Sequence, residues 1–179
     1  MMGDTVPRIV VLVSGGGTNL QALIDAAARG ELGGSIVAVI SNKPGAGGLD
    51  RAARAGIETG VVNHRDYPER AAFDDALRET IDGYDPDLVV LAGFMRILTD
   101  DFVRHYRGRM LNIHPSLLPA YPGLHTHRRV LESGDAEHGA TVHFVTEELD
   151  GGPAVLQGRV PVHASDTPET LAERVLDQE

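Results

Sequence analysis

The chain contains no cysteine, and this absence excludes several classes of protein at once. Without thiols there are no disulfides, no thiolate ligands for zinc or iron–sulfur clusters, and no cysteine nucleophile. No apolar run approaches the roughly 20 residues that cross a bilayer. The stretch from Ile9 to Val13 is also too short and too poorly flanked to be a signal sequence. We therefore expect a cytoplasmic protein with no membrane partner.

Lysine is almost absent as well, since Lys43 is the only lysine beside fifteen arginines. No Gly-rich loop is followed by lysine, so a Walker A phosphate site is excluded. Lys43 precedes Pro44 in a turn-like context that does not suit a Schiff base. The formal net charge of −10 opposes nucleic-acid binding, which depends on clustered basic residues. A small-molecule substrate is favoured.

What the chain does have is a normal globular composition, with 179 residues of which 42% are hydrophobic. This suits one domain, or two closely packed lobes, around a buried core. Apolar β-rich runs alternate with segments of helical periodicity through the first half. The expected strands are Arg8–Val13, Ser35–Ser41, Glu58–Val62 and Leu88–Ala92, and the expected helices are Asn19–Arg29, Gly47–Ala55 and Pro68–Asp82. Such alternation predicts a Rossmann-like α/β fold, with a mostly parallel twisted sheet and helices on both faces.

The regular alternation of strands and helices ends after Gly93. We expect a helix near Thr99–Tyr106 and a strand Met110–His114. A Pro-rich loop then runs to Gly123, and a helix follows from about Thr126 to Ser133. Strands Thr141–Val145 and Ala154–Val160 follow without a helix between them, so they predict an antiparallel edge in the C-terminal half. The expected lobes are about 8–93, which binds a mononucleotide, and about 94–179. A helical pattern from Pro168 continues to the last residue, so we expect an incomplete C-terminal end.

The loop Ser14-Gly15-Gly16-Gly17-Thr18 joins the first strand to the first helix. Its glycines let amide groups approach an anion at a helix N-terminus, where the helix dipole assists. The alternative is a turn that only reverses the chain. Dinucleotide binding is disfavoured, because Leu20 replaces the third glycine and the second strand ends in Ser41-Asn42 without an acidic residue. One phosphate fits better than NAD.

Asn112 and His114 end a buried strand two residues apart on the same face, and Asp150 precedes a Gly-Gly turn. An amide, an imidazole and a carboxylate supply what acyl transfer to an amine needs, which is oxyanion stabilisation and a route for the proton. Each residue also has a structural interpretation. A histidine at a strand end is commonly a structural donor, Asn112 also suits a turn cap, and Asp150-Gly151 is a common turn pair.

Three longer stretches carry a resemblance to a known family: the run from Asn112 to His127, Glu137-His138-Gly139, and Asp150-Gly151-Gly152-Pro153. They resemble phosphoribosylglycinamide formyltransferases, and the resemblance extends from Arg8 to Glu179. The resemblance implies transfer of a formyl group from 10-formyltetrahydrofolate to the amine of 5′-phosphoribosylglycinamide, in purine (IMP) synthesis. The transfer would be a direct attack through a tetrahedral intermediate.

The resemblance also implies roles for individual residues. Asn112, His114 and Asp150 match the catalytic set. Folate contacts carry over to Arg70, Met95, Arg96, Ile97, Leu98, Asn112, Thr146, Glu147, Glu148, Leu149 and Asp150. Contacts with the ribonucleotide carry over to Gly17, Thr18, Asn19 and Glu179.

Other functions stay open beside this one. A 10-formyltetrahydrofolate hydrolase uses a similar residue set but typically has a regulatory domain at its N-terminus, and methionyl-tRNA formyltransferase has an added C-terminal domain. A non-catalytic folate- or nucleotide-binding module is a third alternative. His125-Thr126-His127 has a spacing that zinc can use, but we expect no metal, because neither cysteine nor a His-Glu-x-x-His motif is present. The oligomeric state is open, a homodimer included.

Overall fold

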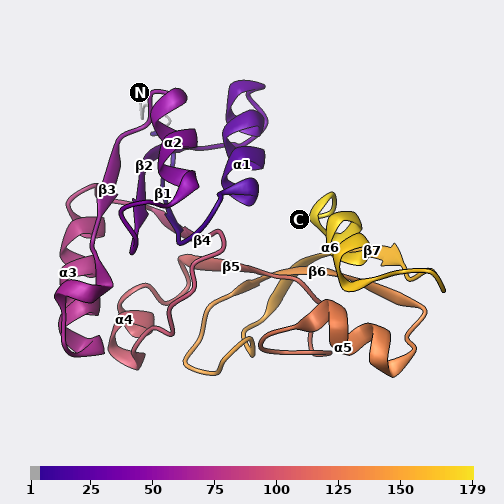
Figure 1. The fold of residues 1–179 in the computed structure, drawn as a ribbon. Coiled ribbons are helices and arrows are strands. Elements are labelled where there is room, and N and C mark those ends of the chain that lie inside the picture. Colours follow the sequence, from indigo (N-terminus) through magenta and orange to yellow (C-terminus); the bar gives the residue numbers. More distant parts are fainter. Residues whose placement is uncertain (1–4) are drawn as a thin grey trace. The chain divides into compact units, whose positions relative to one another are not determined.

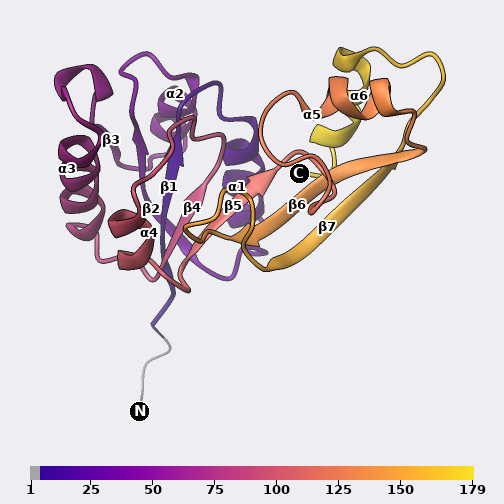
Figure 2. The same cartoon turned by 90° about the horizontal axis from the view of Figure 1, so that it is seen from below.

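The computed structural model describes residues 5–179, in two compact units that divide after Met110. Figures 1 and 2 show the course of the chain from two directions. The first unit contains four parallel strands, β1 (Arg8–Val13), β2 (Ser35–Ser41), β3 (Thr59–Val61) and β4 (Leu88–Leu91). Their order is β3-β2-β1-β4, so the chain moves outward from β1 first on one side and then on the other. The parallel sheet is confirmed.

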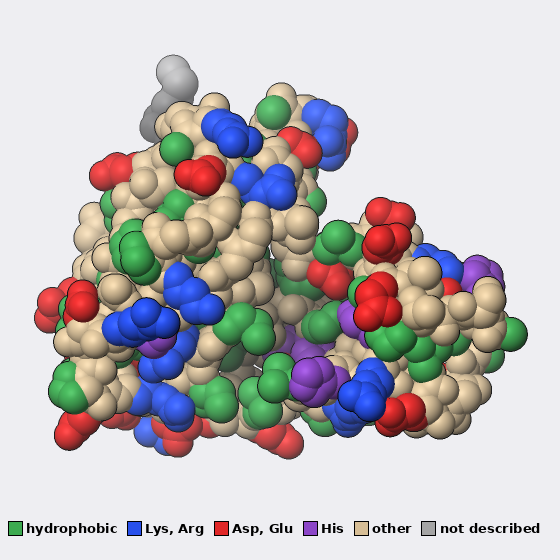
Figure 3. Space-filling model, in the orientation of Figure 1, with side chains coloured by type: hydrophobic (Ala, Val, Ile, Leu, Met, Phe, Trp, Pro, Cys, Tyr) green, Lys and Arg blue, Asp and Glu red, His purple; other side chains and the backbone are tan. Residues whose placement is uncertain are grey.

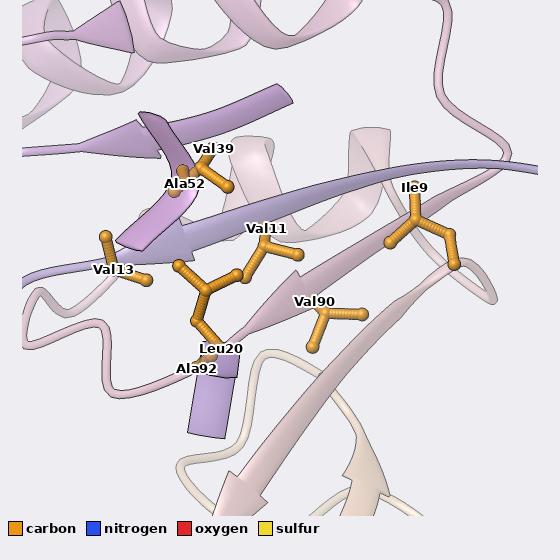
Figure 4. Packing of buried hydrophobic residues seen from close by; sticks show 8 residues of the cluster. All are labelled: Ile9, Val11, Val13, Leu20, Val39, Ala52, Val90 and Ala92. Atoms are coloured by element: carbon orange, nitrogen blue, oxygen red, sulfur yellow. The ribbon is translucent and has the colours of Figure 1, made fainter. Parts of the chain in front are cut away.

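Helices cover both faces of this sheet. The helices are α1 (Thr18–Ala28), α2 (Gly47–Arg54), α3 (Arg70–Asp82) and α4 (Asp100–His105), with a short 3-10 turn η1 (His64–Asp66) before α3. Alternate residues of each strand face opposite sides. One side of β1 packs with α1 and α2, through the residues drawn in Figure 4: Ile9, Val11, Val13, Leu20, Val39, Ala52, Val90 and Ala92. Because both sides are covered, β1 is a continuous apolar run.

The second unit contains antiparallel strands β5 (Met110–His114), β6 (Glu137–Phe144) and β7 (Ala154–Pro161), in the order β5-β6-β7. Helices α5 (Thr126–Ser133) and α6 (Pro168–Leu176) pack on this sheet through a small core of Val130, Ala140, Val160, Leu171 and Val175. The expected antiparallel edge is therefore confirmed, and β5 belongs to it too.

The expected boundaries are close except at two places. Strand β6 begins at Glu137, four residues before the expected Thr141, because His138 to Ala140 are buried opposite β7 although His138 and Gly139 are poor strand formers. Helix α6 ends at Leu176, where the amide of Asp177 closes the last turn. The expectation that the helix continues to the final residue is therefore wrong.

Candidate active site

All three residues expected to be catalytic lie in the second unit, and the structure brings them together. His114 and Asp150 face each other, with Nδ1 of the imidazole 3.5 Å from Oδ2 of the carboxylate. Both side chains are only 7% exposed. The separation is longer than a normal hydrogen bond, so the contact is an ion pair when the imidazole is protonated.

The backbone of the Pro-rich loop holds both partners. Nε2 of His114 donates to the carbonyl oxygen of Tyr121 at 2.9 Å, which leaves Nδ1 as the nitrogen that gains or loses a proton. The amide of Gly123 donates to Oδ2 of Asp150 at 2.8 Å. Asp150 itself has a φ of 53°, a left-handed conformation that aspartate tolerates better than most residues. The local backbone thus sets the directions of both side chains.

Asn112 reaches the same cluster through a residue that the sequence analysis did not select. Its Nδ2 lies 3.3 Å from Nε2 of His143, its partner across the β5–β6 pair. Nδ1 of His143 donates to the carbonyl of Phe144 at 3.0 Å, so Nε2 is the acceptor when the ring is neutral. The same Nε2 is 3.8 Å from Oδ1 of Asp150. His143 therefore connects the amide and the carboxylate.

Two further polar residues were missed because their role is visible only in the fold. Thr141 is fully buried and bridges the Pro-rich loop, since its hydroxyl donates to the carbonyl of Ser116 at 2.7 Å and accepts from the amide of Leu118 at 3.1 Å. Gln157 on β7 donates to the carbonyl of Leu118 at 2.8 Å. No local signal in the sequence marks them, because both strands contain other polar residues, such as His138 in β6 and Arg159 in β7.

A pair of histidines beside this cluster is kept neutral. Nδ1 of His127 and Nε2 of His138 are 3.0 Å apart, and His138 is 1% exposed. Burial, followed by the nearby His127, lowers the pKa of His138 to about 4, and burial also lowers the pKa of His127. Among residues 5–179, no group of three or more His, Cys, Asp or Glu side chains is arranged to hold a metal ion.

The expected phosphate loop lies in the first unit at the start of α1. Gly17 occupies the N-cap position with a φ of 77°, and no side chain caps the helix. A Cβ on Gly17 would lie 2.6 Å from Cα of Gly48, so only glycine fits there. Thr18 and Asn19 form the first turn, which contains no acidic residue. A helix N-terminus that no side chain caps is a suitable anion site.

The expected folate segment after β4 is held at its two ends. The amide of Met95 donates to Oγ of Ser14 at 2.8 Å, and the amide of Thr99 donates to the buried carboxylate of Asp74 at 2.7 Å. Between these anchors Met95 and Ile97 are 64% and 60% exposed, so this loop does present apolar side chains. The guanidinium of Arg96 lies over the ring of Phe73, 5.2 Å from its centroid.

Of the remaining expected residues, Arg70, Glu147, Glu148 and Leu149 are exposed, whereas Leu98, Thr146 and Glu179 are half-buried. Arg70 is the first residue of α3, and Leu149 is 63% exposed in the loop before Asp150. Glu179 follows α6, where its amide bonds to carbonyls of the last turn. Although the chain carries a formal charge of −10, basic side chains gather on the face drawn in Figure 3, over the part of the first unit with α3 and α4.

Comparisons with known proteins agree with this fold. The family described as Formyl transferase matches residues 7–179. The chain belongs to this formyl transferase family. No helix within residues 5–179 is long and apolar enough to cross a membrane.

The relatives of this formyl transferase are enzymes of purine synthesis. It is 58% identical to the phosphoribosylglycinamide formyltransferase of Escherichia coli over 96% of its own length and 81% of that protein. It is 54% identical to the trifunctional purine biosynthetic protein adenosine-3 of Bos taurus, but the match spans only 17% of that longer protein.

Solved structures share the fold of this formyl transferase. The phosphoribosylglycinamide formyltransferase of Coxiella burnetii has a TM-score of 0.92 at 54% identity, with 97% of this chain and 81% of the other covered. Glycinamide ribonucleotide transformylase 1 of Symbiobacterium toebii has a TM-score of 0.94 at 46% identity, with 99% and 86% covered.

Proposed function

We propose that this protein transfers the formyl group of 10-formyltetrahydrofolate to the amine of 5′-phosphoribosylglycinamide, in the synthesis of purines in the cytoplasm. The observation that carries the proposal is the buried cluster of Asn112, His114 and Asp150, in a chain 58% identical to a phosphoribosylglycinamide formyltransferase. The substrates are two small molecules, and the reaction uses no metal.

The chemistry follows from the polarity of the cluster. The amine attacks the formyl carbon, and negative charge develops on the formyl oxygen. An Nδ2–H of Asn112 stabilises this charge, and so does the positive charge of a protonated His114. Asp150 stabilises the imidazolium, because its carboxylate faces the same Nδ1. It then accepts the amine proton, directly or through water. The tetrahedral intermediate collapses as the bond between the formyl carbon and the folate nitrogen breaks, and the departing nitrogen takes a proton from His114, which Asp150 then restores.

Hydrogen bonds from the backbone explain why this cluster needs no large rearrangement to act. The Tyr121 carbonyl keeps Nε2 of His114 protonated, so both ring nitrogens carry protons in the imidazolium. The Gly123 amide holds one oxygen of Asp150 in place. Preorganised groups of this kind do not reorient during the reaction, and this lowers the barrier.

Substrate recognition is assigned by the family resemblance. Gly17, Thr18 and Asn19 hold the phosphate of the ribonucleotide, and Glu179 contacts its glycinamide end. Folate is contacted by Arg70, Met95, Arg96, Ile97, Leu98, Asn112, Thr146, Glu147, Glu148, Leu149 and Asp150. The apolar exposed side chains of Met95 and Ile97 suit the flat pterin ring, and Arg70 suits an anionic folate tail.

The direct test is to follow formyl loss from 10-formyltetrahydrofolate spectroscopically, with and without 5′-phosphoribosylglycinamide. We expect turnover only when the ribonucleotide is present. Equal turnover without it would identify a hydrolase. Folate binding without any turnover would instead identify a binding module.

A further inference from the structure

The first unit contains a pocket that the proposed reaction does not use. We call it the second pocket, to distinguish it from the proposed active site. It has a volume of about 640 Å³ and is lined by Ser14–Gly16, Lys43–Gly47 and Asn63–Arg65. These three segments follow β1, β2 and β3, so the pocket lies at the carboxyl ends of three parallel strands. Open α/β sheets bind their ligands at such ends. Gly17, Thr18 and Asn19, which are assigned to the substrate phosphate, do not line this pocket, although Ser14 to Gly16 of the same loop do.

The charge of the lining is positive. Lys43, the only lysine of the chain, and Arg65 both line the pocket, and no aspartate or glutamate does. Within residues 5–179 neither cation forms an ion pair with an acidic side chain. Two cations that line one pocket without an acidic partner, in a protein with a formal charge of −10, favour an anionic ligand.

Buried hydrogen bonds hold the lining in place. Oγ of Ser14 donates to Oδ1 of Asn42 at 2.6 Å, and both side chains are almost fully buried. Nδ1 of His64 donates to the backbone carbonyl of Asn42 at 2.9 Å, which leaves Nε2 of His64 as an acceptor in the neutral ring. The amide of Lys43 donates to Oγ of Ser41 at 3.0 Å. The pocket therefore has a preformed floor, and ligand binding does not have to order it.

The glycine loop contributes to two surfaces. The carbonyls of Gly15 and Gly16 accept hydrogen bonds from the amide of Gly48 and from Nε of Arg51, at 3.0 and 2.6 Å. These bonds tie the first half of the loop to α2, next to the second pocket. The second half, from Gly17, begins α1 and is the loop assigned to the substrate phosphate. One loop thus separates two potential anion sites.

We propose that this second pocket binds a phosphomonoester of nucleotide size, such as a nucleoside monophosphate. Lys43 and Arg65 hold the phosphate by charge-assisted hydrogen bonds. The volume lies within the range of small-molecule sites. Pro44, Ala46 and His64 also line the pocket and are the residues that would contact a base. This binding is separate from formyl transfer and does not depend on it.

The test is calorimetric titration of the full chain, without folate, using adenosine 5′-monophosphate and, separately, inorganic phosphate. Lys43→Gln and Arg65→Gln each remove one charge, and Arg54→Gln removes the same charge from an exposed site on α2 that does not line the pocket. We expect each pocket substitution to weaken nucleotide binding on the order of tenfold, as losing a charged hydrogen bond does. Arg54→Gln should leave the affinity unchanged.

A second variant separates the two anion sites. Asn19→Ala changes the loop assigned to the substrate phosphate and should leave nucleotide binding to the second pocket intact. If Asn19→Ala abolishes binding while Lys43→Gln and Arg65→Gln do not, the nucleotide occupies the substrate loop and the proposal is wrong. Absence of binding to the unmodified chain would also overturn it. So would binding of γ-linked triglutamate that is tighter than nucleotide binding and that Lys43→Gln and Arg65→Gln weaken, because the pocket would then serve carboxylates.

Discussion

The first unit offers ligands mainly its backbone, whereas the second offers buried side chains. At the start of α1 the groups proposed to bind an anion are amides, and the residue at the N-cap is a glycine with a φ of 77°. Around His114 the functional groups are an imidazole, a carboxylate and an amide, each held by a hydrogen bond or an ion pair. Substitutions in the two units should therefore act differently. In the first unit, substitutions that add atoms should impair ligand binding, and in the second, substitutions that remove polar groups should lower turnover.

The largest effect should come from the second unit. Asp150→Asn preserves the shape and an acceptor for the Gly123 amide but removes the charge that faces His114. Turnover should fall by on the order of a thousandfold, the scale of a lost general base. His114→Ala should cause a comparable loss. Both are measured as initial rates of formyl transfer, with circular dichroism to verify the fold. Retention of activity within tenfold in either variant would refute the mechanism.

The first unit is tested by adding a single methyl group. Gly17→Ala places a Cβ 2.6 Å from Cα of Gly48 and forces alanine into a left-handed conformation. That conformation alone costs about 1–2 kcal/mol. We expect kcat/KM for the ribonucleotide to fall on the order of tenfold or more.

Gly30→Ala is the matched control for this change. Gly30 has a similar φ of 72°, but no heavy atom lies within 4 Å of the added Cβ. It should lower stability without affecting the KM of the ribonucleotide. Equal effects of the two substitutions on KM would mean that the Gly17 loop does not bind the substrate.

The buried histidines should make the second unit sensitive to acid. The pKa of His138 is about 4 in the folded chain against 6.5 for the free side chain, so the unfolded chain binds more protons between these values. The contribution of neutral His138 to the free energy of unfolding is fully present above about pH 6.5. It is lost as the pH drops toward 4, by about 3 kcal/mol in total. Chemical denaturation of the wild-type and His138→Gln proteins at pH 7 and pH 5 tests this. An equal loss in both proteins would exclude His138 as the cause.

A smaller effect is expected at the buried hydroxyl that supports the Pro-rich loop. Thr141→Val keeps the shape but removes the bridge between Ser116 and Leu118. Stability should fall by about 1–3 kcal/mol. Turnover should fall on the order of tenfold, because a small misplacement of catalytic groups is costly. Thr80→Val, which removes a hydroxyl bonded within α3, is the control, and its turnover should be unchanged.

The smallest effect is expected at an exposed charge of the first unit. Arg70→Ala should raise the KM for folate several-fold more than it lowers turnover, because exposed ion pairs contribute about 0.2–1 kcal/mol. Arg78→Ala, on the same helix, should leave the KM for folate unchanged. An unchanged KM for folate in Arg70→Ala would mean that Arg70 does not contact folate.

The elements that the sequence predicted best are those whose pattern is local. Strands Ser35–Ser41 and Met110–His114 and helix Thr126–Ser133 have the expected bounds, because their apolar periodicity or their flanking glycine and proline residues define them. The first half of β6 was missed, since His138 and Gly139 become strand residues only by pairing with Val160 and Arg159 of β7. Such pairing is a tertiary contact, which a local pattern does not contain.

The sequence by itself determined the alternating α/β order of the first unit and the glycine loop, and it predicted the three polar residues that lie together in the second unit. Only the tertiary structure decided which groups orient them. His143 becomes a neighbour of Asn112 through the register of β5 and β6, and the Tyr121 carbonyl becomes a partner of His114 through the path of a loop. Propensity and periodicity act over a few residues, whereas these contacts join strands and loops whose register the folded backbone sets.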